Sequence, residues 1–197
     1  MGTTLRVLLI EDNPDDETLV QLALTRGGFE PTMLRVERAL DMSDALDREP
    51  WDLVISDYNL PGFDAPSALA LLQAHALDIP FIIVSGTISE HAAVTSMKAG
   101  AHDYFNKGAL KRLAPAVSRE LQEARRRSEH RRAEQALRDS ELRFRELTSS
   151  LAQRIATDAA AIEAELAERS DGAHERIRGI VEQLKGFARA IGDPPLL

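Results

Sequence analysis

The chain has 197 residues, an apolar share of 44 % and a formal net charge of −8 at pH 7. This length suits one standard domain with an extension, or two small domains, and the apolar share is sufficient for a buried core. The acidic balance disfavours nucleic acid or an anionic membrane as a partner of the whole protein, because both require clustered positive charge. The sequence contains no cysteine, which excludes disulfides and thiolate metal sites.

The N-terminal stretch Met1–Asn13 holds one short apolar run that is followed at once by acidic residues. The run is too short for a membrane span and lacks the pattern of a signal peptide. We therefore expect a cytoplasmic protein with no membrane partner.

The first half of the chain alternates short apolar runs with amphipathic stretches. The runs predict β-strands over Leu5–Ile10, Pro31–Val36, Asp52–Ser56, Pro80–Ser85 and Asp103–Asn106. The stretches between them predict helices over Pro14–Arg26, Ala39–Arg48, Ala65–Ala76 and Glu90–Ala99. This alternation is typical of βαβ units, whose parallel strands are buried on both faces. The sequence thus predicts an α/β domain with a five-stranded, parallel, doubly wound sheet.

The pattern changes after about Arg112, where no further strand candidate appears and Ala, Glu, Arg and Leu dominate. A heptad seam is formed by Leu137, Ser140, Phe144, Leu147 and Leu151, and it then shifts by a step of four to Ile155, Ala159, Ile162 and Leu166. Ser170–Gly172 predict a break, and Gly192 ends a shorter helix whose stripe contains Ile177, Ile180, Leu184, Phe187 and Ile191. We predict an all-α extension in which a long helix, with coiled-coil character, and a shorter antiparallel helix form a hairpin.

Chemically active side chains fall at the carboxyl ends of the predicted strands, where sites gather in an open parallel sheet. Glu11 and Asp12 follow the first strand, and Asp57 follows the third. Ser85 closes the fourth strand, and Lys107 follows the fifth. Carboxylates that meet at one edge repel one another, and a hard cation with oxygen ligands, such as Mg²⁺, would compensate their charge.

Asp57 is the candidate nucleophile, because a carboxylate can attack phosphorus and form an acyl phosphate. The phosphoryl oxygens would then need hydrogen-bond donors. The Lys107 ammonium, the Ser85 hydroxyl, the metal and backbone amides can supply them.

The alternative is that these acids are ordinary loop residues or helix caps. Asp12, Asp15 and Asp16 stand beside Pro14 and could cap the first predicted helix. An acid pair, a further acid, a hydroxyl and a lysine at four successive strand ends nevertheless favour the phosphoryl chemistry.

Four stretches carry a family resemblance: VLLIEDNPDD, LVISDYNLPGFDA, FIIVSGTISE and AGAHDYFNKG. They occur in order within about the first 120 residues, and they resemble the signature stretches of response-regulator receiver domains of bacterial two-component systems. The resemblance implies a flavodoxin-like receiver domain over 1–120. It also implies that this domain binds Mg²⁺ and accepts a phosphoryl group from a histidine kinase or a phosphotransfer protein.

The resemblance implies a role for each residue at the strand ends. Asp57 resembles the phosphoacceptor, and Lys107 resembles the lysine that binds the phosphate. Glu11 and Asp12 resemble the acids of the metal site, to which Asp57 also belongs. The backbone carbonyl of Asn59 would be the third protein ligand.

The switch residues of the family also have counterparts here. Ser85 matches the switch hydroxyl, and Tyr104 matches the aromatic residue that rotates, although Tyr104 could also be a half-buried edge residue. Two departures concern this surface: Gly86–Thr87 follow the serine where alanine is common, and Gly108 replaces a proline that often follows a cis bond. Since a cis bond before a non-proline residue costs about 3 kcal/mol, we expect a trans bond or a reshaped loop at Gly108.

The extension resembles part of a histidine kinase. RAEQALRDSELRFREL looks like a signalling helix in a coiled-coil linker over 121–145, and the remainder resembles a dimerisation hairpin over 146–197. Gln153 stands where the phosphorylated histidine would be, and an amide has no nucleophilic nitrogen. Two hairpins would bury their apolar stripes as a four-helix bundle, so we predict a homodimer.

The expected function is a signalling switch that relays phosphorylation through protein–protein contacts. No helix-turn-helix follows the receiver, and residues 146–197 carry nine acids against six bases, so no nucleic-acid partner is expected. The arginines of Arg125–Arg132 fit a solvated helical face better than a phosphate-binding site. Two alternatives stay open: a phosphorelay protein that uses His174, and a pseudo-kinase adaptor that pairs with a histidine kinase. We expect no enzymatic activity beyond Mg²⁺-dependent autophosphorylation and autodephosphorylation of the receiver.

Overall fold

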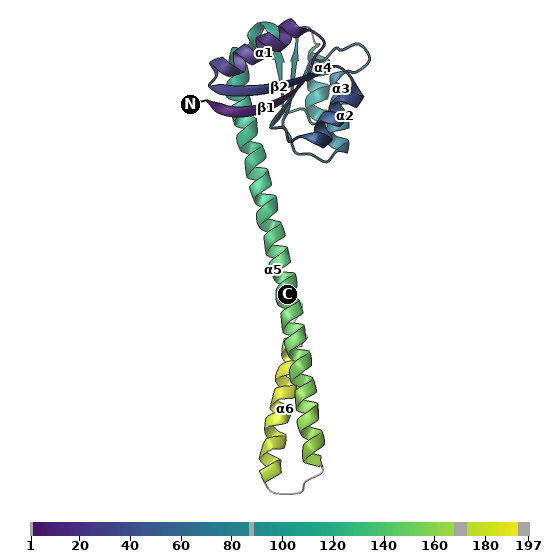
Figure 1. Cartoon of the computed structure of the whole chain (residues 1–197), viewed down its shortest axis with the longest axis vertical. Coiled ribbons are helices and arrows are strands. Elements are labelled where there is room, and N and C mark those ends of the chain that lie inside the picture. The colour runs from purple at the N-terminus through teal and green to yellow at the C-terminus, as the bar shows by residue number, and fades with distance from the viewer. Residues whose placement is uncertain (1, 87–88, 168–172, 193–197) are drawn as a thin grey trace. The chain divides into compact units, whose positions relative to one another are not determined.

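A computed structural model describes residues 2–86, 89–167 and 173–192 (Figure 1). The chain divides into two compact units, Met1–His130 and Arg131–Leu197. We call them the receiver unit and the distal unit. The predicted break at Ser170–Gly172 lies outside the described residues.

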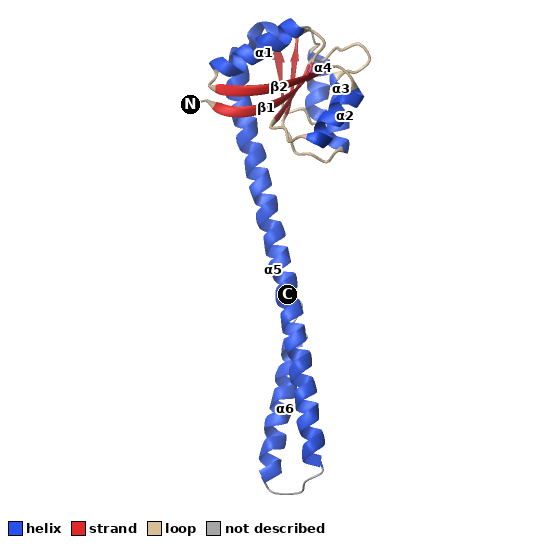
Figure 2. Cartoon of the chain, in the orientation of Figure 1, coloured by secondary structure: helices blue, strands red, loops and turns tan. Residues whose placement is uncertain are grey.

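The receiver unit is built on one sheet of five parallel strands in the order β2-β1-β3-β4-β5 (Figure 2). The strands are β1 (Thr3–Ile10), β2 (Phe29–Val36), β3 (Leu53–Ser56), β4 (Phe81–Ser85) and β5 (Asp103–Asn106). The helices between them are α1 (Pro14–Arg26), α2 (Ala39–Arg48), α3 (Ala65–Ala74) and α4 (Glu90–Ala99). The predicted doubly wound, flavodoxin-like fold is confirmed.

Most predicted bounds agree with the structure, and the differences have local causes. β1 and β2 begin two residues early, because the backbone ladder continues to the pair Thr3 and Phe29. α3 ends before Ala76, whose φ of 53° lies in the left-handed region and cannot continue a helix.

Two turns set the ends of α1. Asn13 is its N-cap, with Oδ1 accepting a hydrogen bond from the Asp15 N–H at 3.0 Å, and Pro14 occupies the first helical position. At the other end Gly27 approaches the last receiver helix so closely that a Cβ at this position would clash with the Cβ of Ala114. Gly28 follows with a φ of 89° and directs the chain into β2.

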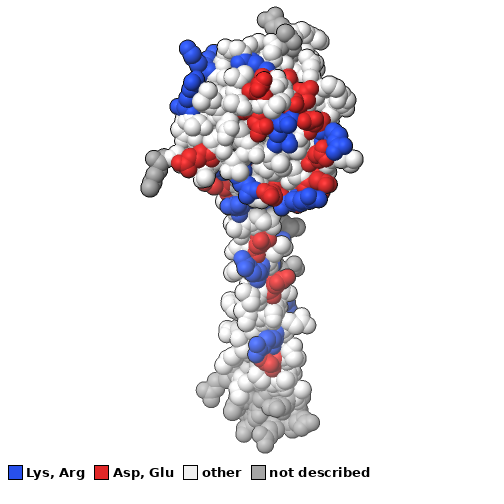
Figure 3. Space-filling model, turned by 45° about the horizontal axis from the view of Figure 1, so that its top comes forward, with Lys and Arg blue, Asp and Glu red and all other residues white. Residues whose placement is uncertain are grey.

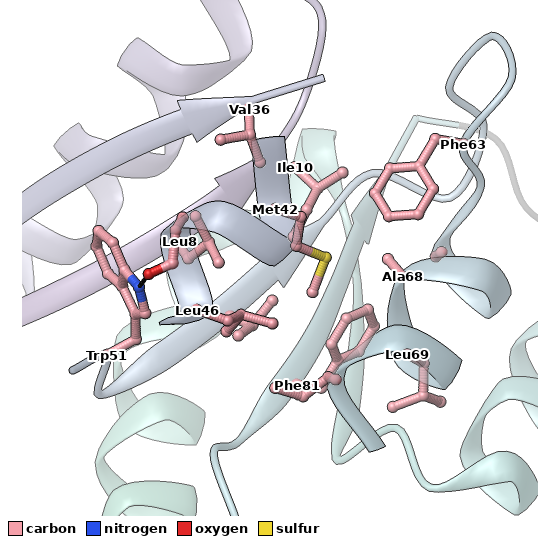
Figure 4. Packing of buried hydrophobic residues seen from close by; sticks show 14 of the residues in the cluster. Leu8, Ile10, Val36, Met42, Leu46, Trp51, Phe63, Ala68, Leu69 and Phe81 are labelled. Atoms are coloured by element: carbon pink, nitrogen blue, oxygen red, sulfur yellow. Dashed lines mark hydrogen bonds between the residues drawn. The ribbon is translucent and has the colours of Figure 1, made fainter. Parts of the chain in front are cut away.

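Successive side chains of the buried strands point to opposite faces and form two cores. One face packs against α2 and α3 through a cluster that includes Leu8, Phe81 and Trp51, whose Nε1–H donates to the Ala45 carbonyl at 2.9 Å (Figure 4). The opposite face packs against α1 and the beginning of α5 through a cluster that includes Leu24 and Val117. The sheet is therefore covered by helices on both sides.

A short 3₁₀ helix, η1 (Lys107–Arg112), leads from β5 into α5 (Leu113–Ala167), and α6 (Ala173–Gly192) follows. In the distal unit the residues that are buried are mostly small: Ala152, Ala159, Val181 and Ala188. Many large apolar side chains of this unit stay exposed, among them Leu137, Leu142, Phe144, Leu147, Leu151, Ile162, Ile180, Leu184 and Phe187.

The surfaces carry charges of both signs. Figure 3 shows acidic and basic side chains interspersed over the face in view. Among the described helices, none combines the length and apolar character that crossing a membrane requires.

Candidate functional site

The strand register brings the predicted site residues to one edge of the sheet. Ile10 of β1 is paired with Ser56 of β3, so Glu11 and Asp57 leave the sheet at the same level. The Asp57 N–H donates to the Ile10 carbonyl at 2.9 Å, which holds the two strand ends together. Lys107 leaves β5, next to β4, at the same carboxyl edge.

The ammonium of Lys107 lies at the centre of the site and donates three hydrogen bonds to carboxylates. Its Nζ is 2.8 Å from Glu11 Oε2, 2.7 Å from Asp57 Oδ2 and 2.6 Å from Asp16 Oδ2. The side chains are only 16 % (Lys107), 3 % (Glu11), 12 % (Asp57) and 17 % (Asp16) exposed. Since three carboxylates share one ammonium, the cluster keeps a surplus of negative charge.

The partial burial of the cluster shifts two of its pKa values. Burial opposes the charged form of Lys107, but the hydrogen bonds to Asp16, Asp57 and Glu11 outweigh it and raise the pKa of the lysine. Burial raises the pKa of Glu11, and the hydrogen bond from Lys107 only partly offsets this effect. Lys107 therefore remains a cation throughout the physiological pH range.

Both oxygens of the Asp57 carboxylate accept hydrogen bonds, and these bonds orient it. Oδ2 faces Lys107, while Oδ1 accepts hydrogen bonds from the backbone N–H groups of Tyr58 at 2.5 Å and Asn59 at 3.4 Å. The Ser56 hydroxyl donates to the Asp57 carbonyl at 2.8 Å and fixes the backbone. The Asp57 carboxylate is thus mostly buried and held by donors on both of its oxygens.

Arg35 of β2 supports the acidic loop from outside. Its Nη1 donates to the backbone carbonyls of Glu11 at 3.0 Å and Asp12 at 3.1 Å, and its Nε donates to Glu17 at 3.1 Å. The Asp12 side chain itself is exposed. The sequence prediction missed Arg35, because no local pattern links an arginine in an edge strand to a loop more than twenty residues earlier.

Asp16 was interpreted only as a possible helix cap, and the structure gives it another contact. The N-cap of α1 is Asn13, whereas Asp16 reaches Lys107. The one signal in the sequence was its place in the first helical turn after the acid pair. That signal does not distinguish a residue that faces the site from one that faces solvent.

The two predicted switch residues lie on neighbouring strands. Ser85 closes β4 and is 2 % exposed, and Tyr104 in β5 is half-buried against the core cluster that contains Phe81. Asn106 bridges the strand ends, because its Nδ2 donates to the Gly86 carbonyl at 3.1 Å and its Oδ1 accepts from the Gly108 N–H at 2.8 Å. The bond between Lys107 and Gly108 is trans, and the loop after it is the 3₁₀ turn η1.

The donor set suits a hard divalent cation. Among the described residues, no group of three or more Asp, Glu, His or Cys side chains is arranged to hold a metal ion. The surplus of carboxylate oxygens around one ammonium nevertheless fits Mg²⁺, which is usually bound by one or two carboxylates and keeps several waters. The alternative function predicted from the sequence, a phosphorelay through His174, depends on a side chain that lies outside the described residues.

A family profile of the response regulator receiver domain matches residues 7–118, which is more than half of the chain. The chain belongs to the response regulator receiver family. It is a receiver of a two-component system, and receivers of this family typically bind Mg²⁺ and take their phosphoryl group from a histidine kinase.

Relatives and solved structures agree with this membership. The receiver is 32 % identical over 107 residues to the phosphate regulon transcriptional regulatory protein PhoB of Klebsiella pneumoniae, covering 52 % of this chain and 44 % of PhoB. It is 32 % identical over 103 residues to the C4-dicarboxylate transport transcriptional regulatory protein DctD of Pseudomonas aeruginosa, covering 52 % of this chain and 22 % of DctD. The chain thus spans less than half the length of these two relatives.

Among solved structures, the signal receiver domain of a candidate Luxo repressor protein from Vibrio parahaemolyticus superposes with a TM-score of 0.56 at 25 % identity. The match covers 64 % of this chain and 95 % of that domain. The structure of a sensor protein from Polaromonas sp. JS666 superposes with a TM-score of 0.53 at 25 % identity. This match covers 61 % of the present chain and 98 % of the chain of the sensor protein. These matches extend over the receiver and leave the output of the distal unit unidentified.

Proposed function

We propose that the protein is a response regulator whose receiver accepts a phosphoryl group on Asp57 from a histidine kinase or a phosphotransfer protein. The observation that carries the proposal is the arrangement of Asp57 between the Lys107 ammonium and two backbone N–H groups, in a site that is mostly buried. This arrangement orients a carboxylate oxygen and supplies donors for the charge that a phosphoryl group brings.

The transfer would join an Asp57 carboxylate oxygen to phosphorus while the bond from phosphorus to the donor's imidazole nitrogen breaks. The electron pair of that bond returns to the imidazole, which takes up a proton. Lys107 stays protonated because its pKa is raised, so it can donate to a phosphoryl oxygen throughout the step. Ser85, at the end of the next strand, would supply a hydroxyl donor to the product.

Glu11, Asp12, Asp57 and the Asn59 carbonyl would hold Mg²⁺. When bound, the ion neutralises charge on the phosphoryl oxygens. Two features of the structure support this assignment: the surplus of carboxylates around Lys107 and the way in which Arg35 fixes the backbone of Glu11 and Asp12. The same set would serve autophosphorylation from small phosphodonors and autodephosphorylation.

The signal would leave the site through Ser85 and Tyr104. A phosphoryl group that recruits the Ser85 hydroxyl would change the space beside β5 and let Tyr104 move, which alters the surface formed by α4 and β5. Lys107 also begins η1, which leads directly into α5. A rearrangement at the site can therefore reach the helix that continues into the distal unit.

The helical hairpin at 146–197 would act as a dimerisation module, and residues 121–145 would form the coiled-coil linker that joins it to the receiver. The inner seam of small residues in the distal unit leaves Phe144 68 % exposed and Leu147 64 % exposed. A second copy is the partner that presents the same apolar surface, and two hairpins together would form a four-helix bundle. At about 2 kcal/mol for each large side chain buried, this pairing would be strongly favourable.

The phosphoacceptor is tested with acetyl phosphate and Mg²⁺, followed by intact-mass measurement of the added phosphoryl group. Wild type should take up one group, and Asp57→Asn should take up none. Asp44→Asn, an exposed residue that pairs with Arg48 on α2, is the matched control and should be labelled like wild type. Labelling of Asp57→Asn, or no labelling of wild type, would contradict the assignment.

The dimer is tested by light scattering in Mg²⁺ with and without beryllofluoride, a phosphoryl mimic. Wild type should have the mass of two chains, and Leu147→Arg should have the mass of one. Leu40→Arg places the same charge on α2, where the leucine is 78 % exposed, and should remain dimeric. A monomeric wild type under both conditions would overturn the dimer.

A further inference from the structure

Asp16 is a partly buried partner of Lys107 that the proposed chemistry does not use. It belongs to the first turn of α1, where acidic residues are common because they interact favourably with the helix dipole. Helix capping is already provided by Asn13, and Asp15 in the same turn is exposed. Asp16 differs from Asp15 because its carboxylate is 17 % exposed and accepts the shortest of the three Lys107 hydrogen bonds.

The three carboxylates use every proton of the ammonium group, because a lysine has three donors and no acceptor. A phosphoryl group on Asp57 changes one of these bonds, since an oxygen of Asp57 becomes part of an acyl phosphate and the lysine must turn to a phosphoryl oxygen. Glu11 is assigned to the metal. Asp16 is then the one carboxylate of the three that neither reacts nor is assigned to Mg²⁺.

We propose that Asp16 is a positioning residue for Lys107, holding the ammonium over Asp57 while the phosphoryl group arrives; this inference rests on the proposed function. Its anchor is firm, because Pro14 and the Asn13 cap fix the first turn of α1 relative to the end of β1. The long side chain of Lys107 has many rotamers, and the charge-assisted hydrogen bond that it donates to Asp16 selects the one that faces the reacting atoms.

The test compares the phosphorylation rate of Asp16→Ala, Asp16→Asn and wild type over a range of acetyl phosphate concentrations in Mg²⁺. Asp16→Ala should lower the maximal rate by about three- to tenfold, because misplacement of an ångström can cost up to about 10²-fold. The half-saturating acetyl phosphate concentration should not rise, because Lys107 keeps its charge. Asp16→Asn retains an acceptor oxygen at the same position and should recover most of the rate.

Asp15→Ala is the matched control, because it removes the same charge from the same helical turn without touching Lys107. It should react like wild type. A second measurement follows the Lys107 ammonium directly by nitrogen-detected NMR of the full chain. The signal of an ammonium held by hydrogen bonds exchanges slowly with water, so it should persist in wild type, Asp15→Ala and Asp16→Asn and be lost in Asp16→Ala.

The outcomes separate this inference from the function on which it rests. If wild type takes up no phosphoryl group, the proposed function fails and the role of Asp16 fails with it. If wild type reacts and Asp16→Ala reacts as fast or faster, the positioning role alone is wrong. If Asp16→Asn is as slow as Asp16→Ala, the charge of Asp16 matters rather than its place as an acceptor, and the positioning role is also overturned.

Discussion

The receiver unit and the distal unit use apolar residues in opposite ways. In the receiver, large side chains such as Phe81 and Leu8 are completely buried, and each face of the sheet is covered by helices. In the distal unit the buried positions are small, with Ala152 and Ala159 on α5, while Phe187 on α6 is 59 % exposed. Two helices have one line of contact and cannot cover their own outer faces, whereas a sheet between two layers of helices closes its core. The receiver unit therefore buries its large apolar side chains within itself, whereas the distal unit leaves large apolar side chains exposed, which is the surface that the proposed second copy would cover.

The largest expected effect is a loss of stability when a buried phenylalanine is truncated, and an exposed phenylalanine provides the comparison. Phe81→Ala should destabilise the receiver by about 3–5 kcal/mol, because a fully buried ring leaves a cavity. Phe187→Ala should change the stability of a lone hairpin by only about 0.5 kcal/mol or less. If the distal unit pairs with a second copy, the cost of Phe187→Ala becomes larger and depends on protein concentration. Urea unfolding at two protein concentrations measures both effects. An equal loss of unfolding free energy in the two variants would contradict the difference between the two units.

An intermediate effect is expected at Gly27, where the receiver packs without space for a side chain. A Cβ there would clash with Ala114, so Gly27→Ala should destabilise the receiver by about 1–3 kcal/mol. Gly86 has open space around its Cβ position, so Gly86→Ala should leave thermal stability almost unchanged. A Gly27→Ala variant that melts like wild type would show that α1 and α5 are not closely packed.

The smallest expected effect is a pH dependence of the receiver. Burial lowers the pKa of His102, and the neighbouring charges that modify it are Glu120, Arg127, Asp78 and Glu123. Its Nδ1 accepts a hydrogen bond from the Phe81 N–H at 3.1 Å, which protonation would remove. The folded receiver binds this proton less readily than the unfolded chain, so stability should fall as the pH drops below the unfolded pKa of about 6.5.

His102→Asn keeps an acceptor and removes the titration, so its stability should depend less on pH between about pH 7 and pH 5. His91→Asn, at an exposed position of α4, is the control and should retain the wild-type slope. Thermal melts of the three proteins at several pH values measure the slopes. Identical slopes would show that His102 does not titrate differently in the folded receiver.

Much of the receiver could be predicted because its signals are local. Pro14 and the Gly27–Gly28 pair mark the ends of α1, and short apolar runs mark the strands. These signals were sufficient to predict the fold and the sheet edge at which Asp57 and Lys107 meet. Strand starts were missed where ladder pairing continues past the apolar run, as at Thr3. The end of α3 was missed because Ala76 adopts a left-handed φ, and alanine, unlike glycine, gives no sequence signal for this conformation.

The sequence by itself determined the order of the elements and the carboxylates at the strand ends, because periodicity and turn residues act over a few positions. Only the tertiary structure decided that Asp16 reaches Lys107, 91 residues away, and that Arg35 holds the backbone of the acid pair. The same applies to the small-residue seam of the distal unit, since Leu147 and Ala152 belong to one amphipathic helix. Which stripe of that helix becomes buried depends on how the partner helix packs against it, and packing is decided by shape in three dimensions.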